Sequence, residues 1–295
     1  MAISIYPITP DFVAEVGDVD LSQGWSAQDE SAIQQAFWKY AVLIFPQQQL
    51  RESDHLRFAE IFGPLETTIG SFRDDSQLRT SDKIADVSNL NTRSEIWDVD
   101  SRQRMFQLGN RLWHTDSSFR HLPGRASLLH GRSIAPIGGH TEFADLRAAF
   151  DALPESERAV LRPLIAEHSI FHSRAKLGFS NFSQAERAAL PPVRQALVRQ
   201  LPENGRETLY LASHMGGIEG LSSADGEALI QRLIDHSVQR QYVYTHRWRE
   251  NDLVMWDNRC TMHRGTDFDD LRWRRDFRRA TVHEAFNSVD LMAVR

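Results

Sequence analysis

The sequence predicts a mainly β fold with helices packed outside its sheets. Apolar or alternating segments typical of strands lie at residues 41–46 and again at 241–248, 252–257 and 274–282, and helical patterns fill much of the middle. A β core must therefore be assembled from distant segments, with the helices outside it. Although 295 residues exceed the usual domain size, β barrels and sandwiches of this length often form one unit, so we expect a single domain over residues 1–295.

The composition indicates a globular protein that acts on a small molecule. Hydrophobic residues make up 41% and charged residues 25% of the chain, and a net charge of −6 argues against a protein that mainly grips nucleic acid. Cys260 is the single cysteine, so no intramolecular disulfide can form, which suits a reducing compartment. Without a leader pattern or a bilayer-spanning apolar run, we expect a cytoplasmic protein away from membranes. The composition leaves open whether the protein forms homo-oligomers.

The first predicted elements are a helix, a buried strand and a second helix. Ser26 stands three residues before Asp29, as in a capping box, and apolar residues follow at helical spacing. The run AVLIFP at 41–46 is apolar throughout and ends at a proline, which indicates a strand buried on both faces. The second helix should cover Ser53–Phe62 and stop at the Gly-Pro pair that follows.

A long polar stretch follows at residues 67–107, broken by the short string IADVSNL, which could be a strand. Long segments of this kind inside a compact domain are often lids over a binding site. A lid and a solvated excursion without a role both fit the composition. We expect residues 67–107 to form a lid.

Strands and helices alternate through the rest of the chain. The strings ASLLHG (126–131) and TEFADL (141–146) resemble strands, with two adjacent glycines between them. A helical insert should span about residues 145–190, interrupted by a proline at 154. A further helix over 223–236 carries an apolar stripe for core packing.

The most informative string for chemistry is WHTDSSF, residues 113–119. In an extended chain, His114 and Asp116 point to one side while Trp113 and Thr115 point to the other. An imidazole and a carboxylate placed in this way can occupy two neighbouring positions of an octahedral metal site, and a second histidine completes a facial triad with three open positions. A three-residue pattern arises easily by chance, so it needs support from elsewhere in the chain.

Support comes from the C-terminal third. In MWDNRCTMHRG, residues 255–265, an apolar strand leads into a turn that presents His263, one of 12 histidines. In the later strand RRDFRRATV, the period of two puts Arg275, Phe277 and Arg279 on one face. Guanidinium groups offer two parallel donors to a carboxylate. A solvated basic strand at a sheet edge is the alternative reading.

Together these strings resemble the taurine dioxygenase and 2,4-dichlorophenoxyacetate dioxygenase family, which depends on iron(II) and 2-oxoglutarate. The resemblance runs over nearly the whole chain and favours the aryloxyalkanoate branch. We therefore expect a double-stranded β-helix, or jelly roll. The strings that carry it are FGPLE (62–66), WHTDSSF, GGHTEFADLRAAFDALP (138–154), YVYTHRW (242–248), WDNRCTMHRG (256–265) and the arginine strand.

The resemblance implies a role for individual residues. The implied iron ligands are His114, Asp116 and His263. Thr141 and Arg275 would bind the distal carboxylate of 2-oxoglutarate, and Arg279 would meet anionic groups at the iron or on the substrate. Asn110 matches a substrate-side position more weakly.

The arginine strand lies one residue farther from His263 than in the relatives, and we aligned it by the motif RRxxxRAT. Arg274 and Arg278 would replace Arg275 and Arg279 if that alignment is shifted by one residue.

The implied reaction is hydroxylation of a small anionic substrate with molecular oxygen as oxidant. An aryloxyalkanoate hydroxylated beside its ether oxygen would break to a phenol and an oxo acid. A sulfonate, an alkyl sulfate or an amino-acid derivative would need the same ligands. From outside the family, a zinc hydrolase or a non-enzymatic jelly-roll binding module stays open. We expect Cys260 to be a packed core residue and Trp113 and Trp256 to pack around the site.

Overall fold

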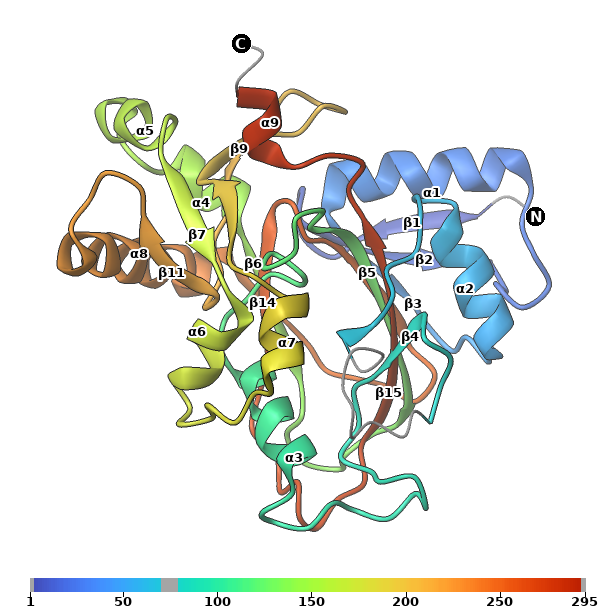
Figure 1. The fold of residues 1–295 in the computed structure, drawn as a ribbon. Coiled ribbons are helices and arrows are strands. Elements are labelled where there is room, and N and C mark those ends of the chain that lie inside the picture. Colours follow the sequence, from blue (N-terminus) through green and yellow to red (C-terminus); the bar gives the residue numbers. More distant parts are fainter. Residues whose placement is uncertain (1–2, 70–78, 293–295) are drawn as a thin grey trace.

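The computed structural model describes residues 3–69 and 79–292 and arranges them in layers (Figure 1). A large and a small sheet pack face to face. Helices α1 (Ala27–Tyr40) and α2 (Glu52–Glu60) cover the outer face of the large sheet, and α4 (Leu146–Asp151) and α8 (Ser223–Ser237) cover the small one. The jelly roll with flanking helices that the sequence predicted is confirmed.

The large sheet brings together both ends of the chain. Strand β3 lies between β2 and β13, so all four of its side chains are buried, as expected for the apolar run at 41–46. The strands in spatial order are β1 (Ser4–Pro7), β2 (Val13–Gly17), β3 (Val42–Phe45), β13 (Leu253–Asp257), β5 (Gly124–Ser133), β15 (Asp276–His283) and β4 (Ile84–Asp86).

The small sheet consists of β12 (Val243–His246), β6 (Thr141–Asp145) and β14 (Thr261–Gly265), all antiparallel. Phe143 of β6 and Trp256 of β13 pack with their ring centroids 5.4 Å apart and join the two sheets. Because β14 is an edge strand of this sheet, the chain before β5 can pair with it, and this pairing builds the site described below.

The first helix begins and ends where the sequence indicates. The Ser26 hydroxyl accepts a hydrogen bond from the Asp29 backbone N–H at 3.1 Å and completes a capping box. Ala41 ends the helix in the left-handed region at φ 62°, and β3 begins at the next residue. Helix α2 covers Glu52–Glu60 where Ser53–Phe62 was expected.

Two smaller sheets and several short helices complete the described chain. The segment at 145–190, expected to be helical, also contains β7, whose partners β8 and β11 come later in the chain and are invisible to local periodicity. The remaining elements are β7 (Ile165–His168), β8 (Val193–Ala196), β9 (Val198–Gln200), β10 (Glu207–Leu209), β11 (Met215–Ile218), α3 (Arg102–Gln107), η2 (Leu108–Arg111), α5 (Glu155–Leu161), α6 (Ile170–Ala175), α7 (Gln184–Ala189), η3 (Arg240–Tyr242) and α9 (Ser288–Met292).

The polar stretch at 67–107 is described except for residues 70–78. Its strand β4 pairs with β15, which confirms the strand suspected in IADVSNL, and α3 lies near its end. Its function as a lid stays a prediction. Within residues 3–69 and 79–292, the helices lack the length and apolar character needed to cross a lipid bilayer.

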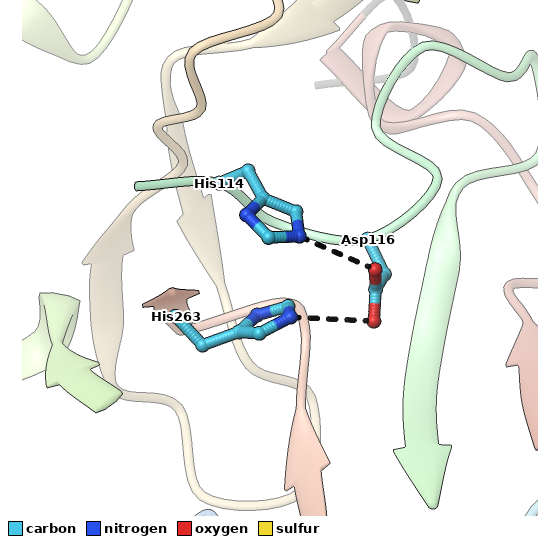
Figure 2. Close-up of side chains that lie close together, drawn as sticks. All are labelled: His114, Asp116 and His263. Carbon is cyan, nitrogen blue, oxygen red and sulfur yellow. Dashed lines mark ion pairs between the residues drawn. The ribbon is translucent and has the colours of Figure 1, made fainter. Parts of the chain in front are cut away.

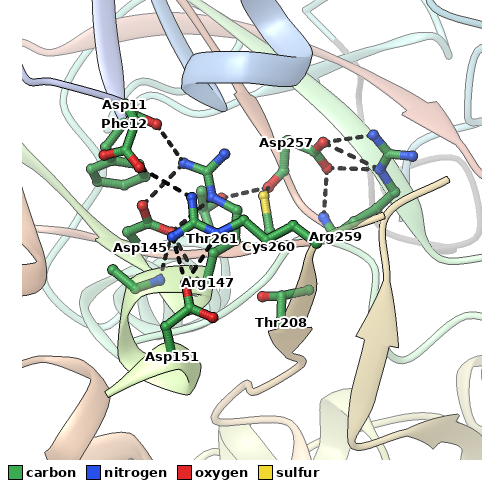
Figure 3. Close-up of polar contacts among 12 residues, drawn as sticks. Asp11, Phe12, Asp145, Arg147, Asp151, Thr208, Asp257, Arg259, Cys260 and Thr261 are labelled. Carbon is green, nitrogen blue, oxygen red and sulfur yellow. Dashed lines mark hydrogen bonds and ion pairs between the residues drawn. The ribbon is translucent and has the colours of Figure 1, made fainter. Parts of the chain in front are cut away.

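A buried arginine ties the two outer layers together (Figure 3). Arg147 of α4 is 1% exposed and forms a bidentate pair with Asp145, with N–O distances of 2.9 and 3.0 Å. Its other N–H groups donate to the backbone oxygens of Lys39 at 3.0 Å and Asp11 at 2.9 Å. The guanidinium therefore joins α4 to the end of α1 and to the chain before β2.

Arg147→Met should destabilise the fold strongly, because it leaves the Asp145 carboxylate buried without its cation. We expect the free energy of unfolding to fall by about 3 kcal/mol or more. Urea unfolding followed by circular dichroism measures this loss. Arg232→Met is the control, since the Arg232 side chain is 53% exposed in its pair with Glu157 and its removal should lower the free energy of unfolding by less than about 1 kcal/mol. Equal losses in the two variants would contradict the prediction.

Candidate metal centre

Three side chains that the sequence singled out converge between the sheets (Figure 2). His114 and His263 pair through an isolated β-bridge, with N–O distances of 3.0 and 2.8 Å between their backbones. Asp116 lies beside them, and its carboxylate oxygens are 3.7 Å from the Nε2 atom of each imidazole. One potential ligand atom from each residue lies within 4.8 Å of the others, and all three residues are buried.

The backbone before β5 directs the first two side chains inward. Thr115, between them, points the other way, and its hydroxyl lies 2.9 Å from the backbone oxygens of both Leu211 and Thr261. This alternation is what the period-two argument predicted. The pairing is a single bridge and not a regular strand, because the chain turns directly after Asp116.

Both imidazoles are neutral, and His114 presents a lone pair to the carboxylate. The Nδ1 atom of His114 lies 2.7 Å from the Leu112 carbonyl oxygen, so it must carry the proton, and Nε2 is left as the free lone pair. Burial lowers the pKa of His114. Burial, followed by the nearby His114, lowers the pKa of His263 well below its usual value.

Asp116 is held ionised and oriented by several donors. Arg279 contacts its Oδ1 at 2.5 Å, and the Ser127 hydroxyl donates to Oδ2 at 2.7 Å. Burial alone would raise the pKa of Asp116, but the charge of Arg279, the nearby His263 and His114 and the Ser127 hydrogen bond outweigh it, so the pKa is lowered. Asn258 in turn donates to the Ser127 hydroxyl at 2.9 Å.

This arrangement fits a metal ion. The Nε2 lone pair of His114 faces the Asp116 carboxylate with no proton between them, and the neutral imidazole of His263 offers a second nitrogen, so a cation among the three would be stabilised. Two histidines and one carboxylate suit a first-row divalent metal with open positions, iron(II) in particular. Cys260 lies outside this group; it is fully buried, burial raises the pKa of its thiol, and it packs in the core as expected.

A cavity of about 90 Å³ adjoins His263 and is lined by Thr141 and Arg275. The guanidinium of Arg275 stacks over the Phe277 ring at 3.8 Å, its Nε is buried without a partner, and burial lowers the pKa of Arg275 to about 10. Within residues 3–69 and 79–292 it pairs with no carboxylate. Thr141 accepts from the Trp248 indole N–H at 3.0 Å and keeps its own proton for another acceptor. A carboxylate in this cavity would accept hydrogen bonds from the Arg275 guanidinium and the Thr141 hydroxyl.

The period-two face of the arginine strand is visible here. Arg275 and Arg279 line this cavity, whereas Arg274 and Arg278 do not. Arg278 points to the other face, where it pairs with Asp86 at 3.0 Å. The alignment by RRxxxRAT is therefore the one that places two guanidinium groups at the site.

The turn before β6 needs its first glycine. Gly138 has φ +73°, and an added Cβ would lie 2.2 Å from the Asp267 backbone oxygen. Glycine therefore lets the chain before Thr141 approach the loop after β14.

A second cavity of about 430 Å³ lies on the other side of His114 and also reaches Asp116. Residues of the stretch at 67–107 form much of its wall, including Ile84, Trp97 and Phe106. Asn110, the weakly predicted substrate residue, lines both cavities and donates to Gln107 at 2.6 Å. The residues that border both cavities are Val87, Trp97, Gln107, Asn110, His114 and Arg279.

Sequence reasoning missed several residues at this site. Ser127 and Asn258 orient Asp116, and Trp256 supports Asn258 with an indole N–H bond of 2.9 Å. The hydrogen bonds that Ser127 and Asn258 make with Asp116 link positions 11 and 142 residues apart. Asn258 lies inside the string WDNRC, which offered a hint. Arg174 and His214 of the larger cavity gave no sequence signal.

The comparisons with known proteins agree with this site. A family model described as "Taurine catabolism dioxygenase TauD, TfdA family" matches residues 4–281. The chain is 40% identical over 285 residues to an alpha-ketoglutarate-dependent 2,4-dichlorophenoxyacetate dioxygenase of Cupriavidus pinatubonensis, covering 96% of this chain and 98% of that protein. It is 34% identical to an (S)-phenoxypropionate/alpha-ketoglutarate-dioxygenase of Sphingobium herbicidovorans, with 91% of each covered. A crystal structure of AAD-2 in complex with Mn(II) and N-oxalylglycine superposes with a TM-score of 0.89 and 41% identity, covering 98% of this chain and 99% of that one.

Ser127→Ala should weaken metal binding without abolishing it, because Asp116 keeps Arg279 but loses a donor that orients it. We expect the Kd for Mn(II) to rise about 10- to 100-fold. Isothermal titration calorimetry measures the Kd, with His114→Ala as the reference for full loss and Ser133→Ala, in the same strand β5, as the matched control. Wild-type affinity in Ser127→Ala would show that this hydrogen bond does not tune the metal.

Proposed function

The chain belongs to the TauD, TfdA family and is an iron(II)- and 2-oxoglutarate-dependent dioxygenase, and we propose that it hydroxylates an aryloxyalkanoate beside the ether oxygen. Family membership removes the zinc hydrolase and the non-enzymatic binding module. A cytoplasmic location belongs to the same proposal and is supported by the single cysteine.

The observation that carries the proposal is that two cavities of different character meet at His114 and Arg279. The smaller one offers a guanidinium and a hydroxyl to a carboxylate. The larger one combines apolar side chains with cationic and acidic ones, and its apolar side chains together with the buried Arg174 suit an aromatic ring that bears a carboxylate. A dioxygenase of this family needs both a cosubstrate and a substrate within reach of one metal.

His114, Asp116 and His263 would hold the iron, and Arg275 and Thr141 would hold the far carboxylate of 2-oxoglutarate. When bound, the iron supplies the oxygen chemistry that couples oxidative decarboxylation of 2-oxoglutarate to hydroxylation of the substrate. Arg279 contributes to metal binding and to both ligand sites, since it holds Asp116 in place and borders both cavities.

The products follow from the chemistry of the hydroxylated carbon. An aryloxyacetate, 2-oxoglutarate and oxygen give succinate, carbon dioxide and a hemiacetal in which hydroxyl and aryloxy groups share one carbon. The hemiacetal breaks to a phenol and glyoxylate without further oxidation. The relatives named for 2,4-dichlorophenoxyacetate and phenoxypropionate support this substrate class over sulfonates, alkyl sulfates and amino-acid derivatives.

A substrate panel tests the proposal. With iron(II), 2-oxoglutarate and oxygen, we expect aryloxyacetates or aryloxypropionates to yield succinate and phenol in equal amounts, and faster than sulfonates, alkyl sulfates or acylated amino acids. Chromatography quantifies both products. Turnover of a sulfonate or alkyl sulfate in preference to every aryloxyalkanoate would replace the proposed substrate class.

Arg275→Ala should weaken 2-oxoglutarate more than Arg279→Ala does, because only Arg275 has a guanidinium free of carboxylates in the smaller cavity. We expect the Kd for 2-oxoglutarate to rise about 10- to 100-fold in Arg275→Ala. Anaerobic titration of the iron(II) protein with 2-oxoglutarate, followed by its visible charge-transfer band, measures both variants. Arg278→Ala on the opposite face is the control. The reverse order of the two variants would show that the register of the strand is shifted.

A further inference from the structure

We propose that Arg174 binds the carboxylate of the substrate in the larger cavity and thereby selects anionic aryl ethers over neutral ones. The proposal rests on the proposed function, because it assigns the substrate end of the same site. Arg174 lies in α6, outside both sheets that carry the metal and 2-oxoglutarate residues. It belongs to none of the motifs that revealed the family.

Arg174 is a buried cation without an acidic partner. It is 5% exposed and lines the larger cavity together with His114 and Asp116. One of its terminal nitrogens donates to the Ser173 hydroxyl at 3.2 Å, and its Nε is buried without a partner. In the part of the chain that the structure describes, no carboxylate forms an ion pair with it. A buried guanidinium in this state is unfavourable until an anion reaches it.

The guanidinium lies in a socket that fits its flat shape. Its carbon is 4.5 Å from the centre of the Phe106 ring on one element, α3. Gly109 of η2 lies against it so closely that an added Cβ would be 2.1 Å from a terminal nitrogen. Because only glycine leaves this space, Gly109 is part of the socket. The socket holds the guanidinium still, which lowers the entropy lost when it binds a ligand.

Two of the other cations of the larger cavity pair with a carboxylate, and the third contacts only neutral oxygens among the described residues. Arg79 pairs with Asp86 at 3.1 Å, Arg279 pairs with Asp116, and Lys83 donates to the Thr67 hydroxyl at 2.8 Å. In the described chain, Arg174 and Lys83 are thus the cations of this wall without a carboxylate partner, and Arg174 is the more deeply buried of the two.

A second cation of the same cavity lies close enough to act on Arg174. Burial, and after it the repulsion from Arg279, lowers the pKa of Arg174 to about 10, so it stays charged at neutral pH. A divalent metal at the neighbouring triad would repel it further. A monoanionic substrate would offset both interactions.

His214 stands next to Arg174 but offers the wrong group for a carboxylate. Ser173 donates its hydroxyl proton to the Ile170 backbone oxygen at 2.8 Å, so it must accept from the Nδ1 of His214, also at 2.8 Å. Burial lowers the pKa of His214 well below its usual value and keeps the ring neutral. Its Nε2 is then an acceptor. The paired donors that a carboxylate needs come from Arg174.

The test compares wild type with Arg174→Met, which keeps the length of the side chain but removes its charge and donors. We expect the KM for the best aryloxyacetate to rise about 10- to 100-fold and the KM for 2-oxoglutarate to stay unchanged. The KM for the matching aryloxyacetamide, which has no charge, should change little. The preference for acid over amide should therefore fall by about tenfold or more, which a merely structural defect would not produce.

Two further variants test the proposal independently if Arg174→Met folds poorly. Gly109→Ala should expel the guanidinium and reproduce the loss of preference with Arg174 still in the chain. Arg174→Lys should restore part of the preference, because it keeps the charge but not the fork. Arg187→Met on the exposed face of α7 is the control. An intact anaerobic charge-transfer band in each variant verifies that the metal and 2-oxoglutarate sites are formed.

The outcomes separate this proposal from the proposed function. Wild-type turnover of aryloxyalkanoates together with an unchanged acid-to-amide preference in Arg174→Met and Gly109→Ala overturns the role of Arg174 alone. Wild-type turnover of a different anion from the panel overturns the substrate class. The same comparison is then made with that anion and its neutral analogue, and loss of preference in both variants still supports anion binding by Arg174.

Discussion

The close approach of two neutral imidazoles to an ionised carboxylate is the constraint on which the rest of the structure depends. The Nε2 lone pair of His114 and the Asp116 carboxylate oxygen, 3.7 Å apart with no proton between them, repel one another, so the protein must hold them together. The β-bridge between His114 and His263 does this by fixing two backbones from distant parts of the chain. Ser127 and Arg279 then prevent Asp116 from turning away. A metal ion converts this repulsion into coordination.

Buried guanidinium groups without a carboxylate partner would likewise separate the two anions, 2-oxoglutarate and the substrate. Arg275 and Arg174 are both buried, both stack on phenylalanine rings and both lack a carboxylate partner in the described chain, yet they line different cavities. Arg279 lies between them and is already neutralised by Asp116. On the proposed assignments, the cosubstrate and the substrate would be sorted by which of these two guanidinium groups each can reach. Their reactive ends are then brought to the same metal.

The sequence predicted the parts of this molecule that depend on local periodicity. The inward pair His114 and Asp116 and the face of Arg275 and Arg279 follow from the period of a strand, and the start of α1 follows from Ser26. The jelly roll needed the additional evidence of several motifs in one order. What stayed hidden depends on contacts between distant segments: β7 looks helical until β8 and β11 pair with it, and Ser127 is an ordinary strand residue until Asn258 is placed beside it.

The placement of functional residues in separate layers has a consequence for how specificity can vary. The metal and 2-oxoglutarate residues lie on or next to paired strands, where a shift would break hydrogen bonds of the sheets. Arg174 and Gly109 lie on short helical elements, α6 and η2, outside that framework. A substitution there can move or remove a guanidinium without changing the register of β14 or β15. If Arg174 binds the substrate as proposed, the chemistry is held by the core, whereas the choice of substrate is set by a wall that can change independently.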